Sequence, residues 1–246
     1  MLQFRHSLLP LFAVNLKNGI PNDPRQLRYL GVSYHVNDQG VIATCKHVVE
    51  AVQDGETLVG MEIYGDCLTY KINDLRCHPK YDFAIGFVER KNYRTVVFHG
   101  KKEIFIGDNI LAYGFTNEGI VNGVLTTAPR LFKGHIVRTH HTAIVPDTRS
   151  TCEISFPALK GFSGTPLLFD KAKSSMAGML FSNLESTIEL HSFSEIEENG
   201  EQFSEKIHKV IELGLVHTAY DIRHYLNDLG INRVPFDAKE YDEIET

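Results

Sequence analysis

The sequence lacks three features that would point to common classes of protein. No apolar run approaches the roughly 18 residues that a transmembrane helix needs. There is no basic excess for binding a nucleic acid, because the net charge at pH 7 is −6. None of the cysteines forms a CxxC pair, which argues against a zinc site; they are Cys45, Cys67, Cys77 and Cys152. We therefore expect no membrane contact, no nucleic-acid partner and no metal.

A clear export signal is also missing. The apolar stretch at residues 8–14 is short and broken by Pro10, and no small-x-small cleavage site follows it. We interpret this stretch as a first β-strand and keep a cryptic export signal as the alternative. Without export, reduced thiols in a cytoplasmic protein are favoured over disulfides.

What the sequence does contain is typical of a soluble globular protein: 246 residues, of which 43% are hydrophobic and 23% charged. Short apolar segments, often β-branched or aromatic, recur between turn signals, and 37–40 (Asn-Asp-Gln-Gly) is typical of a hairpin turn. This pattern predicts an all-β barrel or sandwich. Examples of such segments are 31–36, 41–44, 57–63, 83–88, 109–113, 120–125, 166–169 and 177–181.

The pattern changes after about residue 184. Residues 185–209 are acidic and weakly periodic, which favours a solvated loop or an exposed helix; a gate or regulatory insertion is the alternative. Residues 218–229 have a helical pattern, with Thr218 as N-cap, Asp221 three residues on and Gly230 at the C-cap. The end of the chain, 231–246, is an acidic tail.

The most informative motif is Gly161-Phe162-Ser163-Gly164-Thr165-Pro166-Leu167. A serine between glycines can sit on a tight, exposed turn with backbone N–H groups that point into the same space. A nucleophile that attacks a carbonyl group needs both features. Gly-x-Ser-Gly also occurs in ordinary turns, so the motif gains weight only from partners elsewhere in the chain.

Two upstream residues could be those partners. His47 follows an apolar strand that ends at Thr44, and a short turn would present it at the strand edge. A lone histidine there is usually structural, but the strand–turn context favours a general base. Asp82 opens the apolar strand 83–88, where a partly buried carboxylate needs a partner such as a histidine N–H. Taken alone, Asp82 could equally be a turn or cap residue.

The order His47, Asp82, Ser163 and the sequence around each residue resemble the trypsin/chymotrypsin-like serine peptidases, most closely the HtrA-like branch found in bacteria. The segments that carry the resemblance, in pieces from about residue 31 to 230, are Ala43-Thr44-x-x-His47-Val48-Val49, Asp82-Phe83-Ala84-Ile85, Leu111-Ala112-Tyr113-Gly114-Phe115, the Ser163 heptapeptide and Ala177-Gly178-Met179-Leu180-Phe181-Ser182.

The resemblance implies two six-stranded Greek-key β-barrels with a C-terminal α-helix and an active site between the barrels. A peptidase domain would span 1–230, with barrel one at about 8–98, barrel two at about 101–216 and the helix at 218–229. Ser163 would attack the scissile carbonyl, His47 would take its proton and Asp82 would orient His47. The N–H groups of Gly161 and Ser163 would form the oxyanion hole.

The sequence departs from the family in three ways. Phe162 stands where trypsins carry the aspartate that pairs with a newly cleaved N-terminus, and no activation sequence is visible, so zymogen activation by clipping is not expected. Thr165 replaces a glycine, a small change that we expect to be tolerated. No PDZ-like domain is expected after the barrels, since only about 30 residues follow His217.

The resemblance also places the S1 pocket. Its wall would be Pro157, Ala158 and Leu159, with Phe181 and Ser182 on the strand that lines the cleft. Because the wall carries no acid, an apolar or small P1 residue is expected. Lys160 close by leaves an acidic P1 residue as the alternative.

We therefore predict a cofactor-free serine endopeptidase that acts on protein or peptide substrates. The alternatives are a catalytically silent trypsin-like fold that acts as a binding or chaperone module, and an effector protease switched on by an activating partner protein. Two weaker signals accompany the motif. The histidine cluster His135, His140 and His141 suggests a polar loop more than a metal or phosphate site, and Cys45 suggests a buried structural thiol more than an oxidation-sensitive one.

Overall fold

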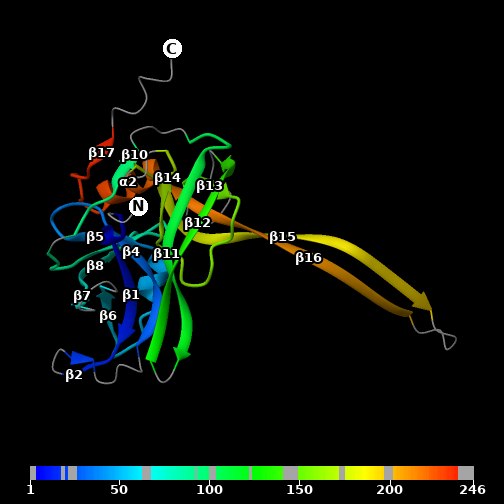
Figure 1. The fold of residues 1–246 in the computed structure, drawn as a ribbon, viewed down its shortest axis with the longest axis horizontal. Helices are drawn as coiled ribbons and strands as arrows, with labels where there is room; N and C mark the ends of the chain where they lie inside the picture. Colours follow the sequence, from blue (N-terminus) through cyan, green and yellow to red (C-terminus); the bar gives the residue numbers. More distant parts are fainter. Residues whose placement is uncertain are drawn as a thin grey trace, which may run out of the picture.

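The structure is a computed structural model. It describes residues 4–17, 20–21, 27–62, 68–91, 93–99, 104–121, 124–140, 149–171, 175–196 and 202–237. No helix within these ranges is both long enough and apolar enough to span a membrane. The architecture is all-β, with two large sheets and a C-terminal helix (Figure 1), as the sequence predicted.

The first sheet comes from the N-terminal part of the chain. Its seven strands follow the order β7-β6-β1-β4-β5-β9-β8, and all its strand pairs are antiparallel. Strand β1 is buried at every position, as its apolar sequence demands, and it pairs with both β4 and β6. The strands are β1 (Leu8–Val14), β4 (Arg28–His35), β5 (Val41–Thr44), β6 (Thr57–Met61), β7 (Thr69–Lys71), β8 (Asn73–Cys77) and β9 (Ala84–Phe87).

The second sheet has eight strands in the order β14-β11-β12-β13-β16-β15-β10-β17, and β14 also pairs with β15. The extra pairing brings β14 back against β15, so that this sheet curls around its own core. The strands are β10 (Val97–His99), β11 (Asn109–Val121), β12 (Val124–His140), β13 (Thr151–Ile154), β14 (Pro166–Phe169), β15 (Ser175–Ile196), β16 (Gln202–Thr218) and β17 (Phe236–Asp237). The division of the chain into two barrels at about residue 100 stays a prediction.

The remaining elements are short. A 3₁₀ helix (Phe4–Ser7) precedes β1, and β2 (Leu16–Lys17) pairs with β3 (Ile20–Pro21). Helix α1 (Lys46–Glu50) follows β5, and α2 (Ala219–Asp228) follows β16. The Thr218 hydroxyl caps α2 by accepting a hydrogen bond of 3.1 Å from the Asp221 N–H, as the capping pattern predicted.

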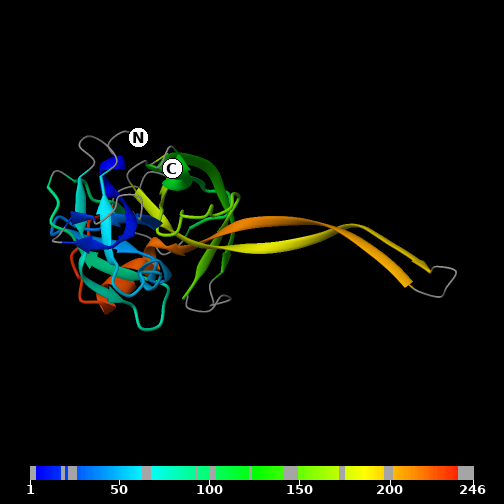
Figure 2. The same cartoon turned by 90° about the horizontal axis from the view of Figure 1, so that it is seen from below.

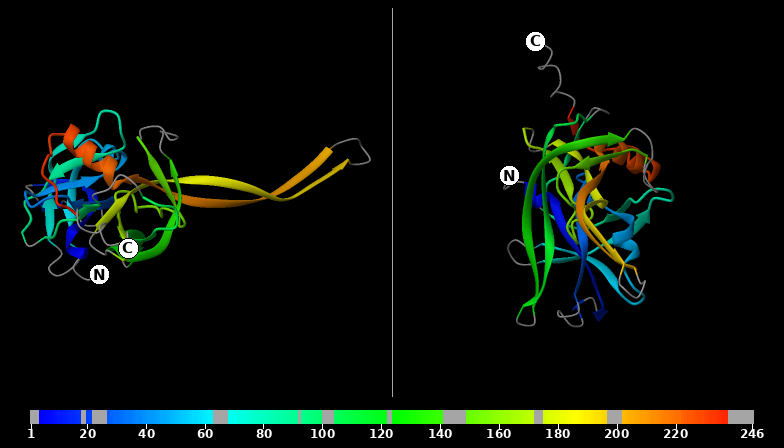
Figure 3. Two further views of the ribbon diagram at one scale, coloured as in Figure 1. Left: turned by 90° about the horizontal axis from the view of Figure 1, so that it is seen from above. Right: turned by 90° about the vertical axis from the view of Figure 1, so that its right-hand side faces the viewer.

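A two-stranded arm leaves the body of the molecule. Strands β15 and β16 stay paired from Gly178–Thr218 out to Ile196–Gln202, far beyond the rest of the second sheet (Figures 1, 2 and 3). The prediction of a solvated loop or exposed helix over residues 185–209 is therefore wrong: the described part of this segment is β-strand. Its charges are solvated, as expected, but its backbone hydrogen bonds run across the pair of strands.

Two apolar clusters fill the molecule. The larger combines the first sheet with α2 and parts of β14–β16, and includes Phe83 and Tyr225, which are fully buried. The smaller lies inside the second sheet and contains Phe162, which is fully buried and packs edge-on against Phe132 with ring centroids 5.4 Å apart. The residue before Ser163 is therefore an apolar anchor, with no charge that could pair with an N-terminus.

Candidate active site

His47 lies on α1, the short helix directly after β5. The sequence predicted a turn at this point; the chain makes one and a half helical turns instead, with Cys45 in the N-cap position. Val48 on the same helix is buried and anchors it against the first core. This packing leaves the His47 side chain 48% exposed.

Asp82 lies two residues before β9 and holds His47 at two points. Its Oδ2 is 2.8 Å from the imidazole Nδ1, and its Oδ1 accepts a hydrogen bond of 3.0 Å from the His47 main-chain N–H. Burial alone would raise the pKa of Asp82, but the hydrogen bonds and charge of His47, with a smaller contribution from His217, lower the pKa below the usual aspartate value. An ionised carboxylate in this place fixes the ring orientation and the tautomer with a proton on Nδ1.

Ser163 lies in the connection between β13 and β14, and the first sheet holds it in place. Its main-chain carbonyl accepts a hydrogen bond of 2.9 Å from the N–H of Val32 on β4. The next residue, Gly164, has a φ of +86°, and a Cβ there would clash with the Val32 carbonyl oxygen. Glycine is therefore required for the Ser163 turn to approach the first sheet so closely.

Gly161, whose N–H is the predicted oxyanion donor, sits in a tight turn. The N–H of Phe162 donates to the Leu159 carbonyl at 2.8 Å, and Gly161 has a φ of +93°. An i to i+3 hydrogen bond with positive φ at the third residue is the geometry of a type II turn. The hydroxyl of Tyr29, on β4, lies 2.8 Å from the Gly161 carbonyl oxygen and so secures the turn from the first sheet.

The predicted wall of the S1 pocket is held by a residue that the sequence did not reveal. The Asn183 side chain accepts a hydrogen bond from the Ala158 N–H at 2.5 Å and donates to the Ala158 carbonyl at 3.0 Å. Its amide also donates to the Glu212 carboxylate at 3.1 Å. Pro157, Ala158 and Leu159 are all half-buried. No local pattern could have indicated Asn183, because it lies 25 residues beyond Ala158.

A second missed residue is His217, near the end of β16. It is fully buried, its ring stacks on Phe181 with centroids 4.1 Å apart, and its Nε2 lies 3.2 Å from the main-chain carbonyl oxygen of Asp82. Burial lowers the pKa of His217 to about 4, so the ring is neutral at neutral pH. Of the two predicted cleft residues on β15, Phe181 is thus buried against His217, whereas Ser182 is exposed.

Three potential metal ligands meet here, but their chemistry fits a hydrogen-bonded pair better than a metal centre. Single ligand atoms of Cys45, His47 and Asp82 lie within 4.8 Å of one another. Burial and the charge of Asp82 raise the pKa of the Cys45 thiol, which opposes the thiolate form that binds metals. The thiol instead donates to the Leu180 carbonyl at 3.6 Å, which supports the structural interpretation of Cys45.

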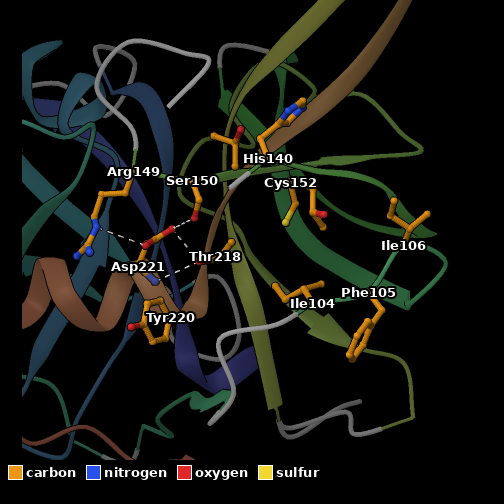
Figure 4. Close-up of a pocket in the computed structure, with 12 residues that line it drawn as sticks. Ile104, Phe105, Ile106, His140, Arg149, Ser150, Cys152, Thr218, Tyr220 and Asp221 are labelled. Carbon is orange, nitrogen blue, oxygen red and sulfur yellow. Dashed lines mark hydrogen bonds and ion pairs between the residues drawn. The ribbon is translucent and has the colours of Figure 1, made fainter. Parts of the chain in front are cut away.

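A separate pocket, lined by β12, β13 and the start of α2, contains none of these residues (Figure 4). Its carboxylate, Asp221, lies 3.0 Å from the Thr218 hydroxyl, is hydrogen-bonded by Ser150 and lies 3.7 Å from Arg149. These partners give Asp221 a structural role in capping the helix.

The polar loop predicted for the histidine cluster is wrong for its described members, because His135 and His140 lie on β12. His140 pairs at 2.6 Å with Glu153, a fully buried residue of β13, which supplies the carboxylate that was missing from the local sequence. His135 is exposed, and His141 lies outside the described residues.

Several solved protease structures share the fold of this chain. The fold is shared with the HtrA-type protease AlgW bound to a tripeptide (TM-score 0.60, 14% identity, 93% of this chain and 62% of AlgW covered). It is also shared with the active form of the Rv3671c protease from M. tuberculosis (TM-score 0.58, 16% identity, 94% and 84% covered) and the MamO protease domain from Magnetospirillum magneticum (TM-score 0.55, 11% identity, 91% and 97% covered).

At these identities the likeness defines a trypsin-like double-barrel fold. The model of the family "Trypsin-like peptidase domain" matches residues 31–179, and the chain belongs to that family. The matched part contains all three residues of the expected triad. No curated protein matches the sequence. The chain spans 62% of the length of AlgW.

Proposed function

We propose that this protein is a serine endopeptidase that cleaves peptide bonds through Ser163, His47 and Asp82. The observation that carries the proposal is that the Asp82 carboxylate contacts both the imidazole Nδ1 of His47, at 2.8 Å, and the His47 main-chain N–H, at 3.0 Å. The chain that contains this pair belongs to the trypsin-like peptidase family. A carboxylate bound to the imidazole Nδ1 leaves Nε2 unprotonated and able to act as a base. The hydrogen bond from Val32 to the Ser163 carbonyl supports a nucleophile held at the junction of the two sheets.

In this mechanism the Ser163 hydroxyl oxygen attacks the carbonyl carbon of the scissile bond while His47 Nε2 takes the hydroxyl proton. The negative charge on the carbonyl oxygen is stabilised by the N–H groups of Gly161 and Ser163. His47 then gives its proton to the leaving amine, and an acyl-enzyme remains on Ser163. Water, deprotonated by His47, hydrolyses this ester and restores the serine. No cofactor takes part.

The turn at Gly161 supports an oxyanion hole that is formed before substrate binds. Type I and type II turns differ by a flip of their central peptide, here the peptide between Lys160 and Gly161. The φ of +93° at Gly161 corresponds to type II. In the described part of the chain, neither the Gly161 N–H nor the Ser163 N–H donates to another main-chain carbonyl, which supports their assignment as oxyanion donors.

We propose an apolar or small P1 residue, because the half-buried wall of Pro157, Ala158 and Leu159 has no charged side chain. Glu212 contacts the residue that holds this wall, because its carboxylate accepts a hydrogen bond of 3.1 Å from the Asn183 side-chain amide. Profiling with a peptide library tests the proposal. Dominant cleavage after Lys or Arg would reject it. Glu212→Gln would then show whether the Glu212 carboxylate binds the Lys or Arg side chain of the substrate.

The activity is tested by labelling with a fluorophosphonate probe, which reacts only with an activated serine. We expect wild type and Ser192→Ala, a control on the exposed arm, to be labelled, and Ser163→Ala to be unlabelled and inactive on casein. Labelling of Ser163→Ala would refute the assignment of the nucleophile. A folded wild type without labelling would instead support the catalytically silent alternative.

A further inference from the structure

The arm formed by β15 and β16 carries an exposed apolar face that the proposed reaction does not use. Outside its base, the arm is a ribbon of two strands. Among the described residues, β15 meets β14 only at Met176–Met179, and β16 meets β13 only at Gly214–Val216. From Glu185 to Ile196 the strand extends about 40 Å at about 3.4 Å per residue. An isolated two-stranded ribbon is only marginally stable in water, so a contact on one face would stabilise it.

The strand register sorts the side chains of the arm into two faces, because residues directly opposite each other share a face. A bulge between Glu189 and His191 shifts the alternation on β15 by one residue. One face, which we call the apolar arm face, then contains the apolar side chains of Ile188, Phe193, Ile207 and Ile211. It also contains Lys209, directly opposite Ile188, and His191, directly opposite Ile207.

These four side chains are 45%, 46%, 50% and 36% exposed, in chain order. The face continues at the base of the arm with the half-buried pair Leu184 and Leu213. Because the four exposed residues alternate between the two strands as diagonal neighbours, they form a zigzag apolar strip, bordered by Lys209 and His191, that starts at the body of the protein. Contiguous exposed apolar surface of this kind marks an interaction site.

The opposite face is mostly polar. It carries Glu185, Glu189, Lys206, His208 and Glu212, together with the exposed Val210. The bulged residue Leu190, which has no partner in the register, is also exposed. Glu189 and Lys206 form an ion pair of 2.9 Å across this face. An amphipathic ribbon that buries neither face against its own domain has the pattern of a strand pair that packs against something else.

The charge of the arm indicates what that partner is. By sequence, residues 185–212 hold eight acidic and two basic residues, and the remaining 23 acidic and 23 basic residues of the chain cancel. The whole net charge of −6 is therefore concentrated in this segment. It would repel a second copy of the arm, a nucleic acid and an anionic membrane, and it would attract a cationic surface.

We propose that the apolar arm face docks a protein partner that presents an apolar patch bordered by Lys and Arg. The apolar patch would cover the strip from Ile188 to Ile211, and the basic border would be attracted by the net negative charge of the arm. The inference does not depend on hydrolysis, so it can be tested in the full-length Ser163→Ala protein. Its failure is then distinguishable from failure of the proposed activity.

The probe is a fluorescent amphipathic peptide with leucine on one face and lysine along the borders of that face. Binding is measured by fluorescence anisotropy. Two control peptides replace every leucine by serine or every lysine by glutamate. We expect micromolar binding of the Leu/Lys peptide, binding at least tenfold weaker for either control, and weakening as NaCl is raised.

Matched variants on β16 test the face. Ile207→Thr and Ile211→Thr keep a β-branched residue in the strand but remove apolar surface, and Val210→Thr makes the same kind of change on the polar face. Ile207→Thr and Ile211→Thr should each weaken binding at least fivefold, whereas Val210→Thr should change it less than twofold. Circular dichroism and thermal melts check that all three remain folded.

Four results would overturn the proposal. They are no binding of the Leu/Lys peptide, equal loss in all three variants, a wild-type dimer in sedimentation that Ile207→Thr abolishes, and flotation with lipid vesicles that Ile207→Thr abolishes. The last two would assign the face to a second copy or to a lipid surface.

Discussion

The imidazole Nδ1 of His47 lies 2.8 Å from Oδ2 of Asp82, while Oδ1 of the same carboxylate accepts the His47 main-chain N–H at 3.0 Å. One side chain therefore fixes both the ring and the backbone of the proposed base. The carboxylate is 19% exposed, so most of its hydrogen-bonding capacity goes to protein groups. This arrangement separates two roles of Asp82, the orientation of the ring and the stabilisation of its charge.

Asp82→Asn should preserve the fold and largely remove activity. The amide oxygen can still accept the main-chain N–H of His47, but the amide NH₂ then faces Nδ1 and favours the tautomer with its proton on Nε2. That tautomer cannot take a proton from Ser163, and kcat should fall by about 10⁴ with a small change in KM.

The control is Asp228→Asn, which alters another histidine–aspartate pair, with His78 at 3.3 Å, outside the site. It should keep kcat within twofold. If Asp82→Asn retained more than a tenth of the wild-type kcat, the orienting role would be wrong.

Gly161→Ala should lower kcat by about 10²–10³, because it removes the turn that would present one oxyanion donor. An alanine there would both adopt an unfavourable positive φ and clash with the Tyr29 ring. The matched control is Gly107→Ala, since Gly107 also has a positive φ, of +93°, but a Cβ there meets nothing within 4 Å.

Backbone strain should lower the free energy of unfolding of both variants by about 1–2 kcal/mol. Only Gly161→Ala should also lower kcat. Chemical denaturation and steady-state kinetics on the same samples separate the two effects. Equal kinetic losses in the two variants would mean that the Gly161 peptide has no special part in catalysis.

The sequence was sufficient to predict many of the short strands and to suggest the triad candidates, because both depend on local patterns. Val41–Thr44 is a short β-branched run and forms β5, and the 37–40 turn closes as expected, with Asn37 Oδ1 accepting the Val41 N–H at 3.2 Å. His47, Asp82 and Ser163 each follow or precede such a strand. The fold brings the first two into direct contact and anchors the third to β4.

The residues that hold the site together were not predictable in the same way. Tyr29 reaches Gly161 across 132 residues and His217 reaches Asp82 across 135, so their roles depend on tertiary contacts alone. The arm was missed for a different reason. Its bulge at Glu189–His191 interrupts the alternation of apolar and polar residues, and its high charge resembles that of a solvated loop.

Two buried histidines should make the protein less stable as the pH falls below about 6.5. Burial lowers the pKa of His217 to about 4 and that of His35 to about 3, whereas in the unfolded chain both titrate near 6.5. Between these values the unfolded state binds more protons than the folded state, so acid favours unfolding. Each histidine should remove roughly 2 kcal/mol between pH 7 and pH 5. Asp82, with its lowered pKa, loses its contribution only below about pH 4 and does not affect this interval.

His35→Phe isolates the effect. Both ring nitrogens of His35 lack a hydrogen-bond partner among the described residues, and the ring stacks on Tyr93 with centroids 3.8 Å apart, so phenylalanine can replace it without leaving a polar group unpaired. Urea denaturation at pH 7 and pH 5 should show a difference in unfolding free energy about 2 kcal/mol smaller in His35→Phe than in wild type. His191→Gln, on the exposed arm, should match the wild-type difference. An unchanged difference in His35→Phe would show that His35 does not remain neutral in the folded protein at pH 5.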